Sequence, residues 1–436
     1  MSPNDRATAA RGGWRERFRL SGATADNLRV KAISELLVKA GRFLLFVLAA
    51  RLLGADAFGR YAFAFTLGNI LANGSDFGLQ MYLSRRVAQE PESRAAVLRQ
   101  SIRAKGLLTL LMLLLLLAAT FLYPRPEEDR ALVFAMGAAS LAQSWTELWN
   151  YMFRGLQSLR EEAMLNLVHS GLALVIGVAL LAAGAGPLGL ALALFVAAGI
   201  TSIVAVVRLR RRGLLTTPAL SLPITPALRE AAPIGIAILI SILYFRIDVL
   251  FLERMCDDAE VGRYGAAYRL LESLLFLPAI FLAAVYPAFA EKARTDRAEM
   301  RRLHQVTLRW MVVLSLAVVT GLLLFTTFGL RLLFGPGYEG SLPILRVLAP
   351  SLIFIYVNYG LTHFMVALHA QKWNAIFALA CLLLNCGLNY LWIPRWAGVG
   401  AAAATVATEG LLFLLCFGLV ARKMRAETRD AQTGNA

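Results

Sequence analysis

Apolar residues in this chain come in long blocks rather than at every second or every third position. The blocks 107–123, 164–185, 187–207 and 311–328 are nearly unbroken, and positions 111–117 are all Leu or Met. A bilayer core about 30 Å thick needs roughly 20 apolar residues in a helix, whereas core helices of soluble proteins are shorter and amphipathic. The pattern therefore predicts a helical protein that crosses a membrane many times.

Twelve transmembrane helices account for the apolar segments. We expect them at about 33–53, 58–82, 106–123, 131–152, 164–184, 187–207, 232–252, 263–289, 308–328, 343–368, 373–393 and 398–420. The first, fourth, seventh and eighth contain charged residues. Prolines can bend a transmembrane helix, and candidate bend sites in the second half are Pro233, Pro278, Pro287 and Pro350.

The distribution of charge predicts the orientation. The chain holds 44 Lys and Arg against 28 Asp and Glu, a formal charge of +16. The N-terminal segment through Arg42, the even-numbered connections and the C-terminal tail hold 33 basic and 14 acidic residues, whereas the odd-numbered connections hold nine of each. Basic loops stay in the cytoplasm, so we expect both termini there. Charge spread along one membrane face excludes a nucleic-acid binder, which needs a basic patch on a soluble domain.

An internal repeat divides the chain into two halves. The segment Gly59-Arg60-Tyr61-Ala62-Phe63-Ala64 follows the first span, and Gly262-Arg263-Tyr264-Gly265-Ala266-Ala267 follows the seventh, 203 residues later. Six spans per half give both halves the same orientation, with a pseudo-two-fold axis along the membrane normal, as in transporters with parallel repeats. Chance similarity among small residues is the alternative. The expected regions are a basic cytoplasmic tail (1–30), an N-terminal lobe (31–207), a cytoplasmic linker (208–231), a C-terminal lobe (232–421) and a second cytoplasmic tail (422–436).

Motifs in a fixed order run from about residue 30 to residue 420. The first group is Ala50-Arg51-Leu52-Leu53-Gly54, Phe58-Gly59-Arg60-Tyr61, Asp76-Phe77-Gly78-Leu79 and Arg85-Arg86. The later groups are Arg246-Ile247-Asp248, Gly262-Arg263-Tyr264, Ala266-Ala267-Tyr268-Arg269-Leu270, Leu277-Pro278 and Gly398-Val399-Gly400-Ala401-Ala402-Ala403. Together they resemble Wzx-type oligosaccharide flippases of the multidrug/oligosaccharidyl-lipid/polysaccharide exporter superfamily.

This resemblance implies an all-α fold of two six-helix lobes around a central cavity that opens alternately to each side. It also implies a multi-pass protein of the bacterial cytoplasmic (inner) membrane that flips an oligosaccharide linked to undecaprenyl pyrophosphate, with other polysaccharide-assembly proteins as expected partners. No enzymatic activity, cofactor or metal site is expected. A cation-coupled multidrug exporter of the same superfamily is the alternative. A membrane glycosyltransferase or polymerase is disfavoured because the odd-numbered connections are short.

Embedded cations are candidates for binding the substrate pyrophosphate. A charge inside the bilayer usually faces a cavity or a partner, and Arg donates a fork of hydrogen bonds to phosphate oxygens. Arg246 and Arg269 lie in the seventh and eighth spans, and Lys39 and Arg42 can join them from the first. In the alternative reading, Arg269 pairs with Glu272 three residues on, and Lys39 and Arg42 reach the interface.

Embedded acids are candidates for binding a coupling ion, H+ or Na+. They are Asp248, Asp76, Glu147, Glu272 and Glu409, with Asp248 the first choice. A structural hydrogen bond between helices is the alternative for each, and Asp76 can also cap a helix. Amides and aromatic rings in the fourth, tenth and eleventh spans are candidate sugar contacts: Trp145, Trp149, Asn150, Tyr151, Tyr356, Asn358, Tyr359, His363, Asn385, Asn389 and Tyr390.

Overall fold

The computed structural model describes residues 22–122, 126–216, 222–282, 285, 297–368, 370 and 372–433. Within these residues all regular secondary structure is helical, which confirms the predicted all-α class. The α-helices are α2 (Gly22–Asp76), α3 (Leu79–Gln89), α4 (Arg94–Leu122), α5 (Glu127–Gly155), α6 (Leu159–Ala182), α7 (Gly186–Arg211), α8 (Ile224–Met255), α9 (Asp258–Leu274), α11 (Arg297–Phe334), α12 (Ser341–Leu348), α13 (Ser351–Ala367) and α14 (Lys372–Thr433).

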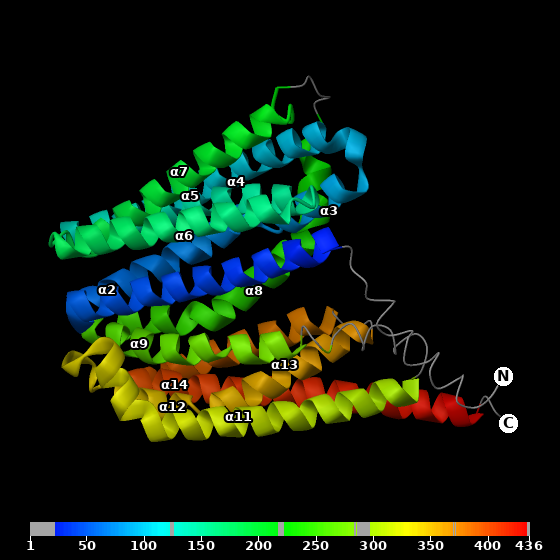
Figure 1. Cartoon of the computed structure of the whole chain (residues 1–436). Helices are drawn as coiled ribbons and strands as arrows, with labels where there is room; N and C mark the ends of the chain where they lie inside the picture. Colours follow the sequence, from blue (N-terminus) through cyan, green and yellow to red (C-terminus); the bar gives the residue numbers. More distant parts are fainter. Residues whose placement is uncertain are drawn as a thin grey trace.

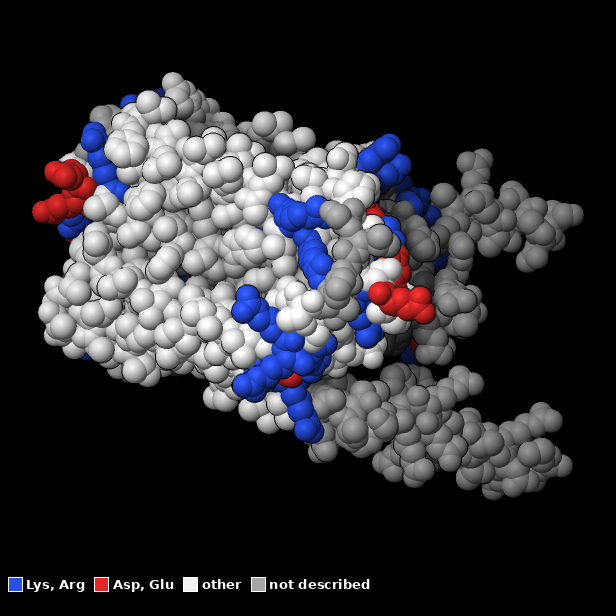
Figure 2. All heavy atoms as spheres, turned by 90° about the horizontal axis from the view of Figure 1, so that it is seen from above, with Lys and Arg blue, Asp and Glu red and all other residues white. Residues whose placement is uncertain are grey.

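The molecule has the surface of a membrane-spanning protein. Seven described helices are long and apolar enough to cross a bilayer, and the bent pair of α12 and α13 makes an eighth. Figure 2 shows Lys, Arg, Asp and Glu gathered toward the two ends of the molecule, with a broad uncharged zone between them. An uncharged belt is what the hydrocarbon core of a membrane requires, so the multi-pass prediction is confirmed.

Two of the helices are too long to be single spans. At 1.5 Å per residue, the 55 residues of α2 and the 62 residues of α14 are each far longer than a bilayer core about 30 Å thick. Each helix is kinked at one residue with positive φ, Gly54 (74°) in α2 and Ala397 (46°) in α14. Each kink lies between two predicted spans. Dividing both helices there makes the fold consistent with the twelve predicted spans.

The helices form two lobes that meet along α2, α8 and α9. Figure 1 shows α4–α7 on one side of these three helices and α11–α14 on the other, with the start of α2 and the end of α14 at one end. At the opposite end, Gly59 of α2 and Gly262 of α9 lie against each other's helix. A Cβ at Gly59 would lie 1.7 Å from Asp258 O, and one at Gly262 would lie 2.0 Å from Ala55 O. Positions 203 apart in the sequence therefore meet, as residues beside a pseudo-two-fold axis do.

Two predicted spans differ from the structure. The second ends at Asp76 rather than 82, because Phe77 (φ 44°) and Gly78 (φ 80°) break the helix before α3. A Cβ at Gly78 would lie 2.6 Å from Ala231 O on α8. The close approach of this turn to α8 of the other lobe therefore requires glycine at position 78. The tenth is divided into α12 and α13, which meet at an angle of 40° where Pro350 begins α13.

The three other prolines predicted as bend sites are Pro233, Pro278 and Pro287, and the structure describes two of them. Pro233 lies inside α8, and Pro278 lies in the short helical segment after α9. Pro287 lies outside the described residues, as does most of the predicted N-terminal tail.

Candidate functional site

A cluster of three charged residues lies where α8 and α9 face α2 of the other lobe. Glu272 of α9 accepts a hydrogen bond from Arg246 of α8 at 2.9 Å and one from Arg269 at 2.9 Å. The guanidinium of Arg269 also lies 4.6 Å from the ring centroid of Phe46 on α2. The side chains of Arg246, Arg269 and Glu272 are 21%, 25% and 31% exposed. Arg269 pairs with Glu272 as the alternative reading of the sequence predicts, and the cluster keeps a formal charge of +1.

The N-terminal lobe presents two cations on the same face of α2 as Phe46. Lys39, Arg42 and Phe46 are spaced three and four residues apart, which places them along one side of a helix. Arg42 lies 4.0 Å from Glu147 of α5, and both side chains are about one-third exposed or more. Lys39 is exposed and forms no ion pair within the described part of the chain. Since Phe46 contacts Arg269, this side of α2 faces the C-terminal lobe. Lys39 and Arg42 on this side are therefore consistent with the prediction that cations of the two lobes face each other.

Asp248 is buried in the C-terminal lobe at the meeting of α8, α9 and α14. It is 3% exposed. Tyr264 donates to its Oδ2 at 2.6 Å, Thr405 donates to the same oxygen at 3.0 Å, and Asn389 donates to Oδ1 at 2.6 Å. Asn389 also donates to Asn385 at 2.6 Å. Among the described residues no cation pairs with this carboxylate, so its charge is balanced only by neutral dipoles.

Glu409 of α14 is the second acid of this kind. It is 3% exposed, and it accepts hydrogen bonds from Tyr244 of α8 at 2.9 Å and from Asn358 of α13 at 2.8 Å. Asn358 also donates to the backbone carbonyl of Glu409 at 3.1 Å. No Lys or Arg in the described ranges forms an ion pair with it. A buried carboxylate without a cation is costly unless a proton or ion is at hand, so both acids differ from Asp76, Glu147 and Glu272, which have cationic partners.

Asp76 pairs with a lysine that the sequence pattern did not single out. Lys105 of α4 is fully buried, and its Nζ lies 3.6 Å from Asp76 Oδ1 and 6.0 Å from the ring centroid of Trp145. The Asp76 carboxylate also lies near the backbone N–H groups of Gly78 and Gln80 at the start of α3, the position that the capping alternative requires. The third span was expected to begin at 106, which put Lys105 just outside it. Lys105 lies about three helical turns after the start of α4, and a lysine directly before an apolar block was the missed signal.

The candidate sugar contacts are mostly taken up by packing. Asn358 and Asn389 bind the two buried carboxylates, and Tyr356 donates to the carbonyl of Leu274 at 2.8 Å. Trp145 and Trp149 pack against each other with ring centroids 5.9 Å apart. No group of His, Cys, Asp and Glu that could hold a metal occurs among the residues that the structure describes.

The sequence matches two known protein families and one curated protein. The family described as "Polysaccharide biosynthesis protein" matches residues 25–293, more than half of the chain. The chain belongs to this family. A second family, MatE, matches residues 233–391. The "Putative O-antigen transporter" of Escherichia coli (strain K12) is 21% identical over 397 residues, which cover 88% of this chain and 95% of that protein.

Solved structures share the two-lobed fold of this polysaccharide biosynthesis family member. An inward-facing multidrug resistance MATE family transporter of the MOP superfamily superposes with a TM-score of 0.74 at 17% identity, covering 91% of this chain and 99% of that chain. The lipid II flippase MurJ in an inward closed conformation gives a TM-score of 0.73 at 14% identity, covering 89% and 87%. With the family matches, these similarities confirm the resemblance to Wzx-type flippases; the structural likeness itself concerns the fold.

Proposed function

We propose that this protein flips an oligosaccharide linked to undecaprenyl pyrophosphate across the cytoplasmic membrane, by alternating access between its two lobes, for surface polysaccharide synthesis. The observation that carries the proposal is the Arg246–Glu272–Arg269 cluster beside α2. Its guanidinium groups are partly exposed at the lobe boundary, and one carboxylate holds both of them. A pyrophosphate entering there can replace that carboxylate as the acceptor, because Arg binds phosphate oxygens through paired donors.

The same proposal assigns the coupling ion, H+ or Na+, to Asp248. Its carboxylate lies beside the hydroxyl oxygens of Tyr264 and Thr405, and a hard cation prefers such neutral and anionic oxygens. The Oδ1 atom of Asn389 is buried with no hydrogen-bond partner among the described residues, so it is available as a ligand. Glu409 is a second candidate for proton binding. Asp76, Glu147 and Glu272 fit coupling less well because cations already pair with them.

The second candidate function is a cation-coupled multidrug exporter. It is favoured by the two buried acids without cations and by the similarity in fold to a MATE family transporter. A binding site for organic cations would be expected to present acids to the substrate. Here the acids without partners are buried, whereas the exposed groups at the lobe boundary include Arg246, Arg269, Lys39 and Arg42. This placement supports an anionic substrate.

The orientation is part of the proposal. Both termini are assigned to the cytoplasm of a bacterium, with the Gly59–Gly262 contact at the outer side of the inner membrane. The basic excess of the tails and even-numbered connections supports this arrangement.

Arg246→Ala tests the function through surface polysaccharide in a strain that lacks the chromosomal copy. We expect this variant to insert normally and to lose export. The matched control is Arg331→Ala, which removes an exposed arginine paired with Glu339 at 2.9 Å and should export normally. Full export by Arg246→Ala would remove this residue from the substrate site.

A further inference from the structure

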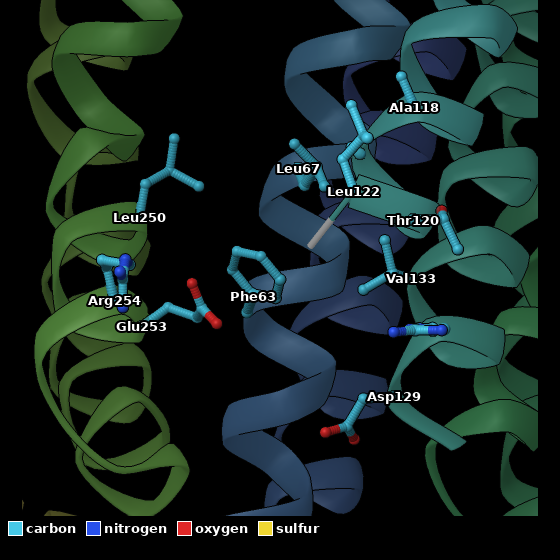
Figure 3. A pocket seen from close by; sticks show the side chains of 12 residues that line it. Phe63, Leu67, Ala118, Thr120, Leu122, Asp129, Val133, Leu250, Glu253 and Arg254 are labelled. Atoms are coloured by element: carbon cyan, nitrogen blue, oxygen red, sulfur yellow. The ribbon is translucent and has the colours of Figure 1, made fainter. Parts of the chain in front are cut away.

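A second site lies at the end of the molecule remote from the termini. A pocket of about 450 Å³ separates α8 from the N-terminal lobe, within the usual range of small-molecule sites. Its walls include Phe63 and Leu67 of α2, Leu122 of α4, Val133 of α5 and Leu250 of α8 (Figure 3). The pocket is therefore built from both lobes, and none of Arg246, Arg269 and Glu272 lines it.

The pocket is apolar and continuous with the membrane-facing surface. Leu122 is 82% exposed and Phe121 beside it is 70% exposed, so the wall formed by α4 ends on the surface that contacts lipid. In Figure 3 the side chains of Phe63 and Leu250 face the space between α2 and α8. A hydrocarbon chain can enter such a space from the bilayer without crossing a polar barrier.

Two arginines lie at the rim of this pocket. Arg130 and Arg254 are among its lining residues, and neither forms an ion pair within the described residues. The Nε atom of Arg130 is buried and has no hydrogen-bond partner there. Asp129 at the same rim is paired with Arg60 at 3.4 Å. Glu253 is also in the wall, so the four charged lining residues have no net charge. An anion here would depend on hydrogen bonds from both arginines rather than on a positive potential.

From this juxtaposition we propose that the pocket binds the lipid part of a polyprenyl phosphate. The isoprene units nearest the phosphate lie against Phe63 and Leu250, and the phosphate oxygens accept from Arg130 and Arg254. The inference rests on the proposed function, because that function supplies a polyprenyl substrate. A long chain cannot pass between the lobes with its polar head and must stay in lipid. A slot with one wall from each lobe lets the chain remain in the bilayer while the head reaches the outer side.

Photolabelling of the full chain tests this site. The protein is reconstituted in vesicles of phosphatidylethanolamine and phosphatidylglycerol with a polyprenyl phosphate that carries a diazirine on the isoprene unit next to the phosphate. We expect labelled peptides to contain Phe63 and Leu250, and excess undecaprenyl phosphate to abolish the labelling. Leu250→Trp, which fills the pocket, should lose most of it. The control Leu324→Trp, at a position on α11 that is 74% exposed, should label as the wild type does.

The arginines are tested by competition. In the double variant Arg130→Gln/Arg254→Gln, undecaprenyl phosphate should compete about tenfold less well, whereas undecaprenol, which lacks the phosphate, should compete as before. Labelling that avoids the pocket, that survives Leu250→Trp, or that extra phosphatidylglycerol removes equally well would overturn the proposal. Specific labelling in a protein whose deletion leaves surface polysaccharide normal would refute the proposed function but leave the lipid site standing.

Discussion

Asp248→Asn separates ion binding from folding more cleanly than any other substitution in the C-terminal lobe. The asparagine oxygen can still accept from Tyr264 and Thr405, which donate to a single carboxylate oxygen at 2.6 and 3.0 Å. The new amide group faces Asn389, whose own oxygen is buried without a partner in the described structure. Asn389 can turn to accept from it if Asn385 turns too, so that the Asn385 amide group donates to Asn389 in place of the present bond between them. We therefore expect the substitution to change the unfolding free energy by only about 1 kcal/mol.

The effect on a bound cation should be much larger. If Na+ binds the folded protein alone, a concentration of about 100 times its Kd stabilises the wild type by about 2.7 kcal/mol. The assay is thermal unfolding of the purified protein in detergent, with NaCl compared against choline chloride at equal ionic strength. The Na+-dependent rise in Tm should vanish in Asp248→Asn, because the only formal anion of the site is gone.

Glu409→Gln is the matched control for this prediction. It neutralises the other buried acid, which is held by Tyr244 and Asn358, and it should keep the Na+-dependent rise. An unchanged rise in Asp248→Asn, or its loss in Glu409→Gln alone, would refute the assignment of the cation to Asp248. A wild type that responds to pH but not to Na+ would identify the coupling ion as a proton.

Three further substitutions test other parts of the structure. Lys105→Met should cost about 3–5 kcal/mol in thermal unfolding by leaving Asp76 buried and unpaired, and adding Asp76→Asn should recover most of the loss. Gly59→Ala places a methyl group 1.7 Å from a carbonyl oxygen of α9, so cross-linking of cysteine pairs across the lobes at that end should fall, whereas Gly265→Ala, whose Cβ would have no neighbour closer than 3.6 Å, should cross-link normally. Glu272→Gln frees both guanidinium groups, so binding of polyprenyl pyrophosphate measured by a lipid overlay should strengthen while export falls.

The membrane-spanning architecture could be predicted because it depends on local composition. Each apolar block of about 20 residues specifies a helix by itself. The alternation of basic and neutral connections agreed with the number of crossings that these blocks predict. The helix break at Phe77 and Gly78 was not predicted, because it depends on contact with α8, where Ala231 and Gly235 lie against Gly78. The two spans that join at the kink at Gly54 form one continuous helix in the structure. In the sequence, only the polar residues between them showed that they are two spans.

The candidate site was predictable only as far as its contacts are local. Arg269 and Glu272 are three residues apart, so helical spacing predicted their pairing. Arg246 joins the same carboxylate from another helix, and two of the three partners that donate to Asp248 lie 141 and 157 residues further on. Such partners depend on how the helices pack, which composition and periodicity do not specify.

A flippase changes the side of the membrane on which the lipid-linked oligosaccharide is found. That side can be measured in cells that lack this protein while glycan synthesis continues, with a membrane-impermeant glycan-modifying reagent on intact spheroplasts. We predict that the lipid accumulates facing the cytoplasm, protected from the reagent, and becomes accessible when the wild-type gene is restored. Accessible lipid and normal surface polysaccharide in the deletion strain would contradict it.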